Sequence, residues 1–447
     1  MAFKTGFSKV CITPPLGAPI SGYYMPRFTK GVLDDIYARA VAFDNGDKKA
    51  VIITLDLCTL TEAQFSLYKS TVADFCSIPE EAVFITCSHT HTGPMIGKDF
   101  ASELRSDPGY DNSLVLAIRD AAAYAIADLK ETEIYSAKSE AKRISFVRRF
   151  RMKDGSVKTN PGIHNDEIDH PLGTPNETVK LIKLVRKDAD DIFLVNFGTH
   201  PDSIGGEYIS GDYPGYVCSG IEAALPGTKC MFLLAPQGDV NHVNVNPTPG
   251  EEAISTIDFD DVPRSLEHAK HMARVIIGAV LSVCTVAEKV DAGNISYATK
   301  RVKIASHQEN DRLDEACQIN ALYSAGRANE LPYDGMELTT VVAEAERIIN
   351  LSKGPDSFEF ILSALKIGDL VFGGMPGEPF TEIANRIYEG SPFEYTILCC
   401  ISNSNGPYFP TTKAYSEGGY EARSSSLAPG GDDIIVGGMC ELLKEMK

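Results

Sequence analysis

The chain has 447 residues, of which 43% are hydrophobic and 23% charged, and its formal net charge is −19 at pH 7. These proportions are typical of a globular protein, and the length is ample for a sizeable core. The acidic balance argues against a nucleic-acid-binding protein, because phosphate contacts need a basic face, and it gives no support for docking on an anionic membrane. We therefore expect a small-molecule substrate as the partner, with no nucleic acid and no stable membrane association.

The eleven cysteines are odd in number and lack the spacing of a disulfide framework, which indicates free thiols in a reducing compartment. No apolar signal region opens the chain. The most apolar helical run, residues 275–287, is shorter than the ~20 residues that a membrane span needs. We expect a cytoplasmic protein, and the sequence leaves its oligomeric state open.

The first part of the chain alternates between predicted strands and helices. Residues 35–45 are predicted to form a strand that ends in a hairpin-turn signal, Asp44-Asn45-Gly46. A helix at 61–75 leads from the next strand to a buried strand at 82–87, and an amphipathic helix follows at 111–130. This order predicts an α/β fold with a mixed, largely parallel central sheet flanked by helices.

Residues 308–353 are rich in Glu, Ala and Leu, and they predict a helical excursion that could be a lid or a subunit contact. The sequence contains no internal repeat, linker or low-complexity tract. We therefore expect one catalytic domain over residues 1–447, with the excursion as part of it. A long helix at 263–287 carries His268 and His271, for which a capping or solvent-facing role is favoured over metal binding.

Four predicted strands end in, or lead into, side chains that can bind a metal or move a proton. In chain order these are His89 and His91, His200, Glu378, and Tyr415 with Tyr420. A further strand delivers Asp239 and Asn241. Because ligands collect at the carboxyl ends of strands in α/β folds, we expect the active site at this edge of the sheet.

Two histidines and a glutamate from separate strand ends match the needs of a catalytic zinc site. Such a site takes about three protein ligands of N/O type and keeps an open position for water. Zinc polarises a carbonyl oxygen and lowers the pKa of a bound water to about 7. From spacing alone, a Zn²⁺-dependent hydrolase and a purely structural role for these residues remain equally open.

Several motifs match, in kind and order, those of one enzyme family. They are Cys87-Ser88-His89-Thr90-His91-Thr92-Gly93-Pro94, Gly198-Thr199-His200, Gly238-Asp239-Val240, Pro376-Gly377-Glu378-Pro379, and Thr411-Thr412-Lys413-Ala414-Tyr415 with Tyr420-Glu421. The chain thereby resembles the neutral/alkaline (non-lysosomal) ceramidases, which are zinc-dependent amide hydrolases. The resemblance runs from residue 6 to about residue 430, and its most specific parts are the first and fourth motifs.

The resemblance implies a role for each matching residue. The zinc ligands would be His89, His200, Glu378 and Tyr415, with Tyr420 as the alternative to Tyr415. His91 would steady the oxyanion or move a proton, and the family's arginine near the oxyanion maps onto Arg148, less closely onto Arg149. We expect the substrate to be bound by Tyr420, Asn241, Asp239 and Tyr23.

The chain also departs from the family pattern. Asn241-His242-Val243 stands where the family has Ser-Pro-Asn, and Leu427 lies where the family carries a further tyrosine. Hydrolysis by metal-activated water needs no serine, so we expect hydrolysis of a soluble amide rather than ceramide. The alternatives are a metal-dependent esterase or phosphoesterase, and a catalytically degenerate binding protein. A dinuclear phosphoesterase is disfavoured because its second Asp-x-His and its Gly-Asn-His-Glu element are missing.

Overall fold

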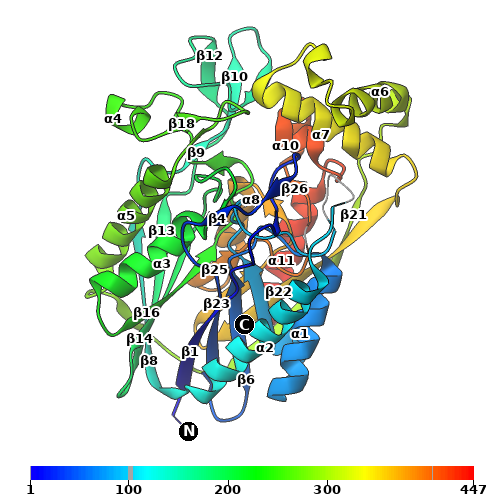
Figure 1. Ribbon diagram of the computed structural model, residues 1–447. Helices are drawn as coiled ribbons and strands as arrows, with labels where there is room; N and C mark the ends of the chain where they lie inside the picture. The colour runs from blue at the N-terminus through cyan, green and yellow to red at the C-terminus, as the bar shows by residue number, and fades with distance from the viewer. Residues whose placement is uncertain (1, 99–103, 405) are drawn as a thin grey trace.

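The computed structural model describes residues 2–98, 104–404 and 406–447, and its centre is a nine-stranded sheet (Figure 1). In spatial order the strands are β16 (Thr228–Leu234), β14 (Asp191–Phe197), β13 (Thr178–Arg186), β8 (Lys130–Glu140), β1 (Lys4–Cys11), β5 (Tyr37–Asp44), β6 (Lys49–Leu55) and β7 (Val83–Cys87), with β20 (Glu288–Val290) paired to β8. This sheet carries β7, β14 and β16, the strands that precede His89, His200 and Asp239.

The α/β fold and the mixed character of the sheet are confirmed, but parallel neighbours do not predominate as expected. Only β6 with β7 and β14 with β16 run parallel, and the other neighbours in this sheet are antiparallel. Each parallel pair is joined by a helix, α1 (Glu62–Cys76) or α3 (Asp212–Ala224). β5 and β6 are instead joined by the predicted tight turn, which can only connect antiparallel strands.

Helices cover one face of this sheet. Besides α1 and α3 they are α2 (Pro108–Ala127) and α5 (Leu266–Val283). Their apolar side chains pack with alternate residues of the strands, such as Phe193, Val195 and Phe197 of β14. The intervening Ile192 and Leu194 belong to a different core on the opposite face. Side chains of successive strand residues point to opposite faces, so β14 is buried on both sides.

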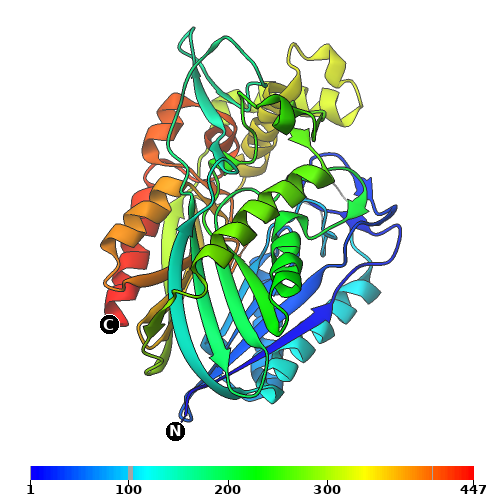
Figure 2. The ribbon, with the colours of Figure 1, turned by 90° about the vertical axis from the view of Figure 1, so that its left-hand side faces the viewer.

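A second sheet covers the other face, and further helices cover that sheet in turn (Figure 2). Its strands are, in spatial order, β21 (Ile295–Ala305), β22 (Ser357–Ile367), β23 (Leu370–Gly374) and β25 (Tyr395–Cys399). The outer helices are α8 (Thr381–Gly390) and α11 (Gly431–Glu445). In Figure 2, α11 in red lies on the opposite side of the molecule from α2 in cyan, which shows the helix–sheet–sheet–helix layering.

Short elements are the remaining parts of the fold, and several of them surround the edge where β7 and β14 end. The short strands are β2 (Pro19–Ile20), β3 (Arg27–Phe28), β4 (Gly31–Val32), β9 (Phe146–Val147), β10 (Arg149–Met152), β11 (Val157–Thr159), β12 (Ile168–Pro171), β15 (Tyr208–Ile209), β17 (Val240–Asn241), β18 (Thr256–Ile257), β19 (Pro263–Arg264), β24 (Glu378–Pro379) and β26 (Tyr408–Phe409). The short helices are α4 (Pro249–Glu252), α9 (Thr412–Glu417) and α10 (Tyr420–Ser424).

The segment predicted as a helical excursion forms two helices between β21 and β22. They are α6 (Leu313–Ser324) and α7 (Gly335–Leu351), and Figure 1 shows them in yellow beside α10. Among the helices of the described residues, none combines the length and the apolar character that crossing a membrane requires.

Candidate metal centre

His89 and His200 lie just beyond the ends of two buried strands. His89 follows β7 at a backbone φ of 64°, and its N–H donates to the Leu57 carbonyl oxygen over 2.9 Å. His200 follows β14, and its N–H donates to the carbonyl oxygen of Val240 over 3.2 Å. A left-handed backbone at a non-glycine residue costs on the order of 1–3 kcal/mol, and such strain collects at functional sites. The fold thus holds His89 in a conformation that most sequences avoid.

Glu378 reaches the same place from the second half of the chain. It opens β24, which pairs in parallel with β26, so that Glu378 lies opposite Tyr408. The preceding Gly377 has a φ of 55°, and a Cβ atom there would lie 2.3 Å from the Pro407 carbonyl oxygen. Only glycine fits this turn, which explains why the Pro-Gly-Glu motif delivers its carboxylate here.

The three ligand atoms are spaced as zinc would require. The Nε2 atoms of His89 and His200 lie 3.3 Å apart, and they lie 3.4 and 3.2 Å, respectively, from Oε2 of Glu378. Bonds of ~2.0–2.1 Å at tetrahedral angles would place neighbouring ligand atoms roughly 3.3 Å apart. All three distances match this separation.

The hydrogen bond made by Nδ1 of each histidine determines how its Nε2 atom can interact with a cation. His89 Nδ1 lies 2.8 Å from the Cys58 carbonyl oxygen, and His200 Nδ1 lies 3.4 Å from that of Gln237. A carbonyl oxygen only accepts, so each Nδ1 carries a hydrogen and each Nε2 is the atom that would offer a lone pair to a bound cation. Two Nε2 atoms and a carboxylate therefore converge, which is the arrangement that a divalent cation stabilises.

Burial and neighbouring charges shift the pKa values of all three side chains in the cluster. Burial lowers the pKa of His200 well below its ordinary value, with Arg148 adding to the effect. Burial opposes ionisation of Glu378, but the neighbouring His89 outweighs it and lowers the pKa of the carboxyl group. For His89 burial also opposes the charge, yet Glu378 and Cys58 raise its pKa, so without a cation this ring holds a proton. A metal would displace that proton.

His91 lies beside the cluster, as predicted. Its Nε2 atom is 3.3 Å from that of His89, and its Nδ1 atom is 3.7 Å from Oδ1 of Asp202. Burial lowers the pKa of His91 to about 3, so the ring is neutral. Gly22 packs against this ring so closely that a Cβ atom there would lie 2.9 Å from the His91 Cγ atom.

Asp202 was not predicted from the sequence, although it follows His200 by only two residues. Its carboxylate accepts from the Tyr23 hydroxyl over 2.5 Å and from Nε and Nη2 of Arg264 over 3.0 and 2.6 Å. Burial raises the pKa of Asp202, but Arg264 and His91 outweigh it and hold the carboxyl group ionised. Tyr23 therefore belongs to the site through Asp202, within reach of His91.

Tyr415 does not join the histidines, contrary to the expected zinc ligand set. It lies in α9, its hydroxyl donates to the Leu427 carbonyl oxygen over 2.6 Å, and its ring packs against His307. Tyr408 takes the place beside the cluster, with its ring stacked 6.3 Å from that of His200. Tyr420 packs against Tyr408 at 5.5 Å. Sequence spacing missed Tyr408, although it follows the last strong strand more closely than Tyr415 does.

The two adjacent arginines face different surroundings. Arg148 lines the cavity beside the histidines, where its Nε lies 2.6 Å from the Glu421 carboxylate and its guanidinium lies 5.3 Å from the Tyr408 ring centre. Arg149 instead contacts Glu417 and donates to the Gly418 carbonyl oxygen. Of the two alternatives, Arg148 is therefore the arginine near the site.

The other expected substrate contacts divide in the same way. Asn241 lines the cavity and donates over 3.0 Å to the side-chain oxygen of Asn160, which is a further residue that the sequence did not predict. Tyr420 also lines the cavity. Asp239 does not line it, because its carboxylate accepts from the backbone N–H and the hydroxyl of Thr381 over 2.7 and 2.9 Å. Asp239 thus secures the first turn of α8.

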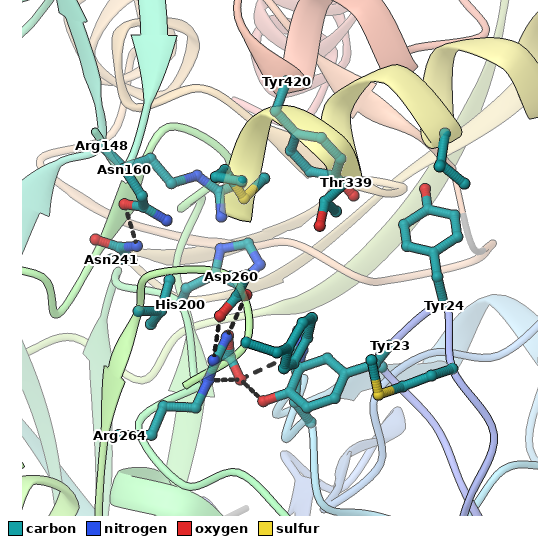
Figure 3. Close-up of a pocket in the computed structure, with 18 of the residues that line it drawn as sticks. Tyr23, Tyr24, Arg148, Asn160, His200, Asn241, Asp260, Arg264, Thr339 and Tyr420 are labelled. Carbon is teal, nitrogen blue, oxygen red and sulfur yellow. Dashed lines mark hydrogen bonds and ion pairs between the residues drawn. The ribbon is translucent and has the colours of Figure 1, made fainter. Parts of the chain in front are cut away.

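The cavity over the histidines holds about 700 Å³ of empty space, open solvent included (Figure 3). Cys58 is the remaining potential ligand nearby, with its sulfur 3.7 Å from His89 Nδ1. That nitrogen already faces the Cys58 carbonyl oxygen, so the thiol lies behind the ring rather than on the cavity side.

Comparisons with known proteins identify the fold. The sequence matches no family model and no curated protein. Two solved structures superpose over 100% of the chain: neutral ceramidase from Pseudomonas aeruginosa, at a TM-score of 0.73 and 18% identity over 75% of its own chain, and a ceramidase complexed with C2, at 0.72 and 16% over 76%. At these identities the likeness establishes architecture: the chain has the fold of the neutral ceramidases.

Proposed function

We propose that this protein is a zinc-dependent hydrolase that cleaves the C–N bond of a small, soluble carboxamide in the cytoplasm. The observation that carries the proposal is the convergence of His89 Nε2, His200 Nε2 and Glu378 Oε2 at separations of 3.2 to 3.4 Å. The ceramidase fold supports it, because the solved structures with this fold are named as ceramidases.

His89, His200 and Glu378 would hold the ion, and Tyr408, rather than Tyr415, would stand beside it. Zn²⁺ bound there would polarise the scissile carbonyl group and lower the pKa of an attacking water. The three protein ligands leave the cavity side free for the substrate, as a catalytic zinc site requires.

The chain's own groups would do the rest of the chemistry. In hydrolysis, water adds its oxygen to the carbonyl carbon, the C–N bond breaks, and a proton passes to the leaving nitrogen. His91 stands beside the cluster with its Nδ1 atom toward the Asp202 carboxylate, and we assign it the transfer of a proton from water to the leaving amine. Arg148, next to Tyr408, adds positive charge where the carbonyl oxygen becomes an oxyanion.

The substrate class follows from the residues that replace the family pattern. Asn241 donates to Asn160 at the position where ceramidases carry a serine. The cavity therefore offers a pair of amide side chains in place of a hydroxyl group. We propose a small amide rather than ceramide on this basis, with an ester as the second substrate type that the same carbonyl chemistry can accept.

Metal analysis followed by a substrate panel tests the proposal. The purified protein should contain one zinc per chain, lose turnover of simple anilides on chelation and regain it with stoichiometric Zn²⁺. Two metals per chain with phosphodiester cleavage would point instead to a phosphoesterase. Zinc without turnover of any amide or ester would leave the protein as a binding protein of this fold.

A further inference from the structure

The helical excursion supplies one wall of the cavity over the histidines. Met336, Thr339 and Val342 line the cavity from α7, and Tyr323 lines it from α6. A spacing of three residues places the α7 side chains on one face of the helix. In Figure 3 the yellow helix crosses above the site, with Thr339 beside Tyr420.

Ion pairs and a hydrogen bond join α7 to α10, the helix that carries Tyr420. Arg423 of α10 contacts Glu337 and Glu344 of α7 at 2.9 and 2.8 Å, and Arg347 donates to the Arg423 carbonyl oxygen over 2.7 Å. One arginine from each helix therefore contacts the other helix: Arg423 of α10 contacts α7, and Arg347 of α7 contacts α10. Partly buried charge pairs in such a network order the groups they join. The wall is thus fixed in place.

The facing wall comes from the loop between β2 and β3. Tyr23, Tyr24 and Met25 line the cavity there, and Tyr24 is hydrogen-bonded to Tyr420. That bond joins the two walls across the cavity. A long chain leaving the histidines on this side would meet either the phenol pair or the α7 side chains.

The arginines and carboxylates that line the cavity are already paired within the protein. Arg264 binds Asp202 and Asp260, and Arg148 binds Glu421. A charged substrate would have to break one of these buried pairs, which leaves an uncompensated charge. The site therefore suits a neutral molecule with an apolar group.

We propose that α7 sets an upper limit on the length of the substrate, so that the enzyme acts on compact neutral amides with a short acyl or arylacyl group. The inference rests on the proposed function for its reaction, but the wall itself does not depend on it. Met336 and Val342 are the side chains whose size sets the limit.

The test uses para-nitroanilides with acyl chains of two to sixteen carbons on the zinc-loaded enzyme. We expect kcat/KM to fall about tenfold or more between the four- and twelve-carbon members, because one methylene group alone can be worth about 10–200-fold in a hydrophobic pocket. Met336→Ala and Val342→Ala should each shift the profile to longer chains. Thr339→Leu, which adds bulk, should shift it to shorter ones.

Val341→Ala is the matched control, since Val341 is buried on the same helix but does not line the cavity. It removes the same side chain as Val342→Ala and should leave the chain-length profile unchanged. If Val341→Ala shifts the profile equally, or if the unmodified enzyme accepts long chains as well as short ones, α7 is not the limit.

A binding series separates this inference from the proposed reaction. His89→Ala removes a ligand but leaves the cavity lining, so the affinity of each anilide for this variant can be measured by calorimetry without turnover. In one outcome, the unmodified enzyme hydrolyses none of the anilides while His89→Ala still binds short chains more tightly than long ones. That result would support the length limit set by α7 and contradict the proposed function. Equal affinities for short and long anilides, or no measurable binding, would contradict the length limit set by α7.

Discussion

Two groups of three histidines differ in what their ring nitrogens face. The first group is His89, His91 and His200, and the second is His242, His268 and His271. In the first, the Nε2 atoms of His89 and His200 face each other and the Glu378 carboxylate. In the second, His242, His268 and His271 line another cavity with Glu251, also with an empty volume of about 700 Å³. Within the described ranges, only the first group joins two histidines and a carboxylate whose ligand atoms lie within 4.8 Å of one another.

Two ring nitrogens of the second group are held in local hydrogen bonds, and His242 Nδ1 is buried without a hydrogen-bond partner among the described residues. His242 Nε2 lies 2.7 Å from the Pro263 carbonyl oxygen, so it carries the hydrogen, and His268 Nδ1 pairs with the Ser255 hydroxyl at 2.9 Å. The rings of His268 and His271 stand 6.3 Å apart on α5. The convergence of ring nitrogens on a carboxylate, rather than the number of histidines, therefore distinguishes the candidate metal centre from the second cavity.

The largest difference should appear when one histidine is removed from each group. His200→Ala should lower amidase kcat/KM by more than about a hundredfold, since even residues that only orient a ligand cost about 10–100-fold. His268→Ala should keep turnover within about twofold of the unmodified enzyme. Steady-state kinetics with a short anilide checks this, and comparable losses from both variants would erase the distinction.

Tyr408 and Tyr415 should differ in their effect on turnover, because only Tyr408 lies beside the first histidine group. Tyr408→Phe should lower kcat by about tenfold or more, because its hydroxyl is hydrogen-bonded to Arg148 and its ring stacks on that of His200 beside the cluster. Tyr415→Phe should leave kcat unchanged and lower the free energy of unfolding by about 1 kcal/mol through the lost bond to Leu427. Kinetics and urea unfolding of both variants measure this. A kinetic defect in Tyr415→Phe alone would restore Tyr415 as the ligand.

The second group should reveal itself through stability in acid. Burial lowers the pKa of His268 to about 3, below its value of ~6.5 in the unfolded chain. The unfolded state therefore takes up the proton first, and stability falls as the pH drops below ~6.5 until the folded pKa is reached. From pH 7 to 5 this residue should contribute a loss of about 2 kcal/mol.

His268→Gln is the test of that contribution. Its free energy of unfolding, measured by urea at pH 7 and pH 5, should fall by about 2 kcal/mol less than that of the unmodified protein. The substitution leaves His89, His91 and His200 in place, so the pH response of the first group is common to both proteins. An equal fall in the two proteins would mean that His268 is not buried in its neutral form.

Sequence patterns could predict the parts of this molecule that depend on local order. The strand that ends at His89 and the turn at Gly377 are specified by neighbouring residues, and both lie where the patterns indicated. Parallel pairs are fewer than the alternation of strands and helices predicts, because the short turn after Asp44 joins β5 and β6 as antiparallel neighbours. Hairpin geometry determined the pairing there.

The site residues that escaped prediction depend on contacts between distant segments. Tyr408 reaches the histidines because β26 pairs with β24, and a pairing of such short strands leaves no periodic signal. Tyr415 matched the motif but is turned away by α9, where its hydroxyl finds the Leu427 carbonyl oxygen. Asp202 acquires its place only when Tyr23 and Arg264 meet it.

The most direct measurement is a crystal structure of the zinc-loaded protein with anomalous data collected on both sides of the zinc absorption edge. The predicted result is one peak bonded to His89 Nε2, His200 Nε2 and a Glu378 oxygen, at ~2.0–2.2 Å from each. A peak among His242, His268 and His271, or no peak at the first group under saturating zinc, would contradict the assignment of the metal centre.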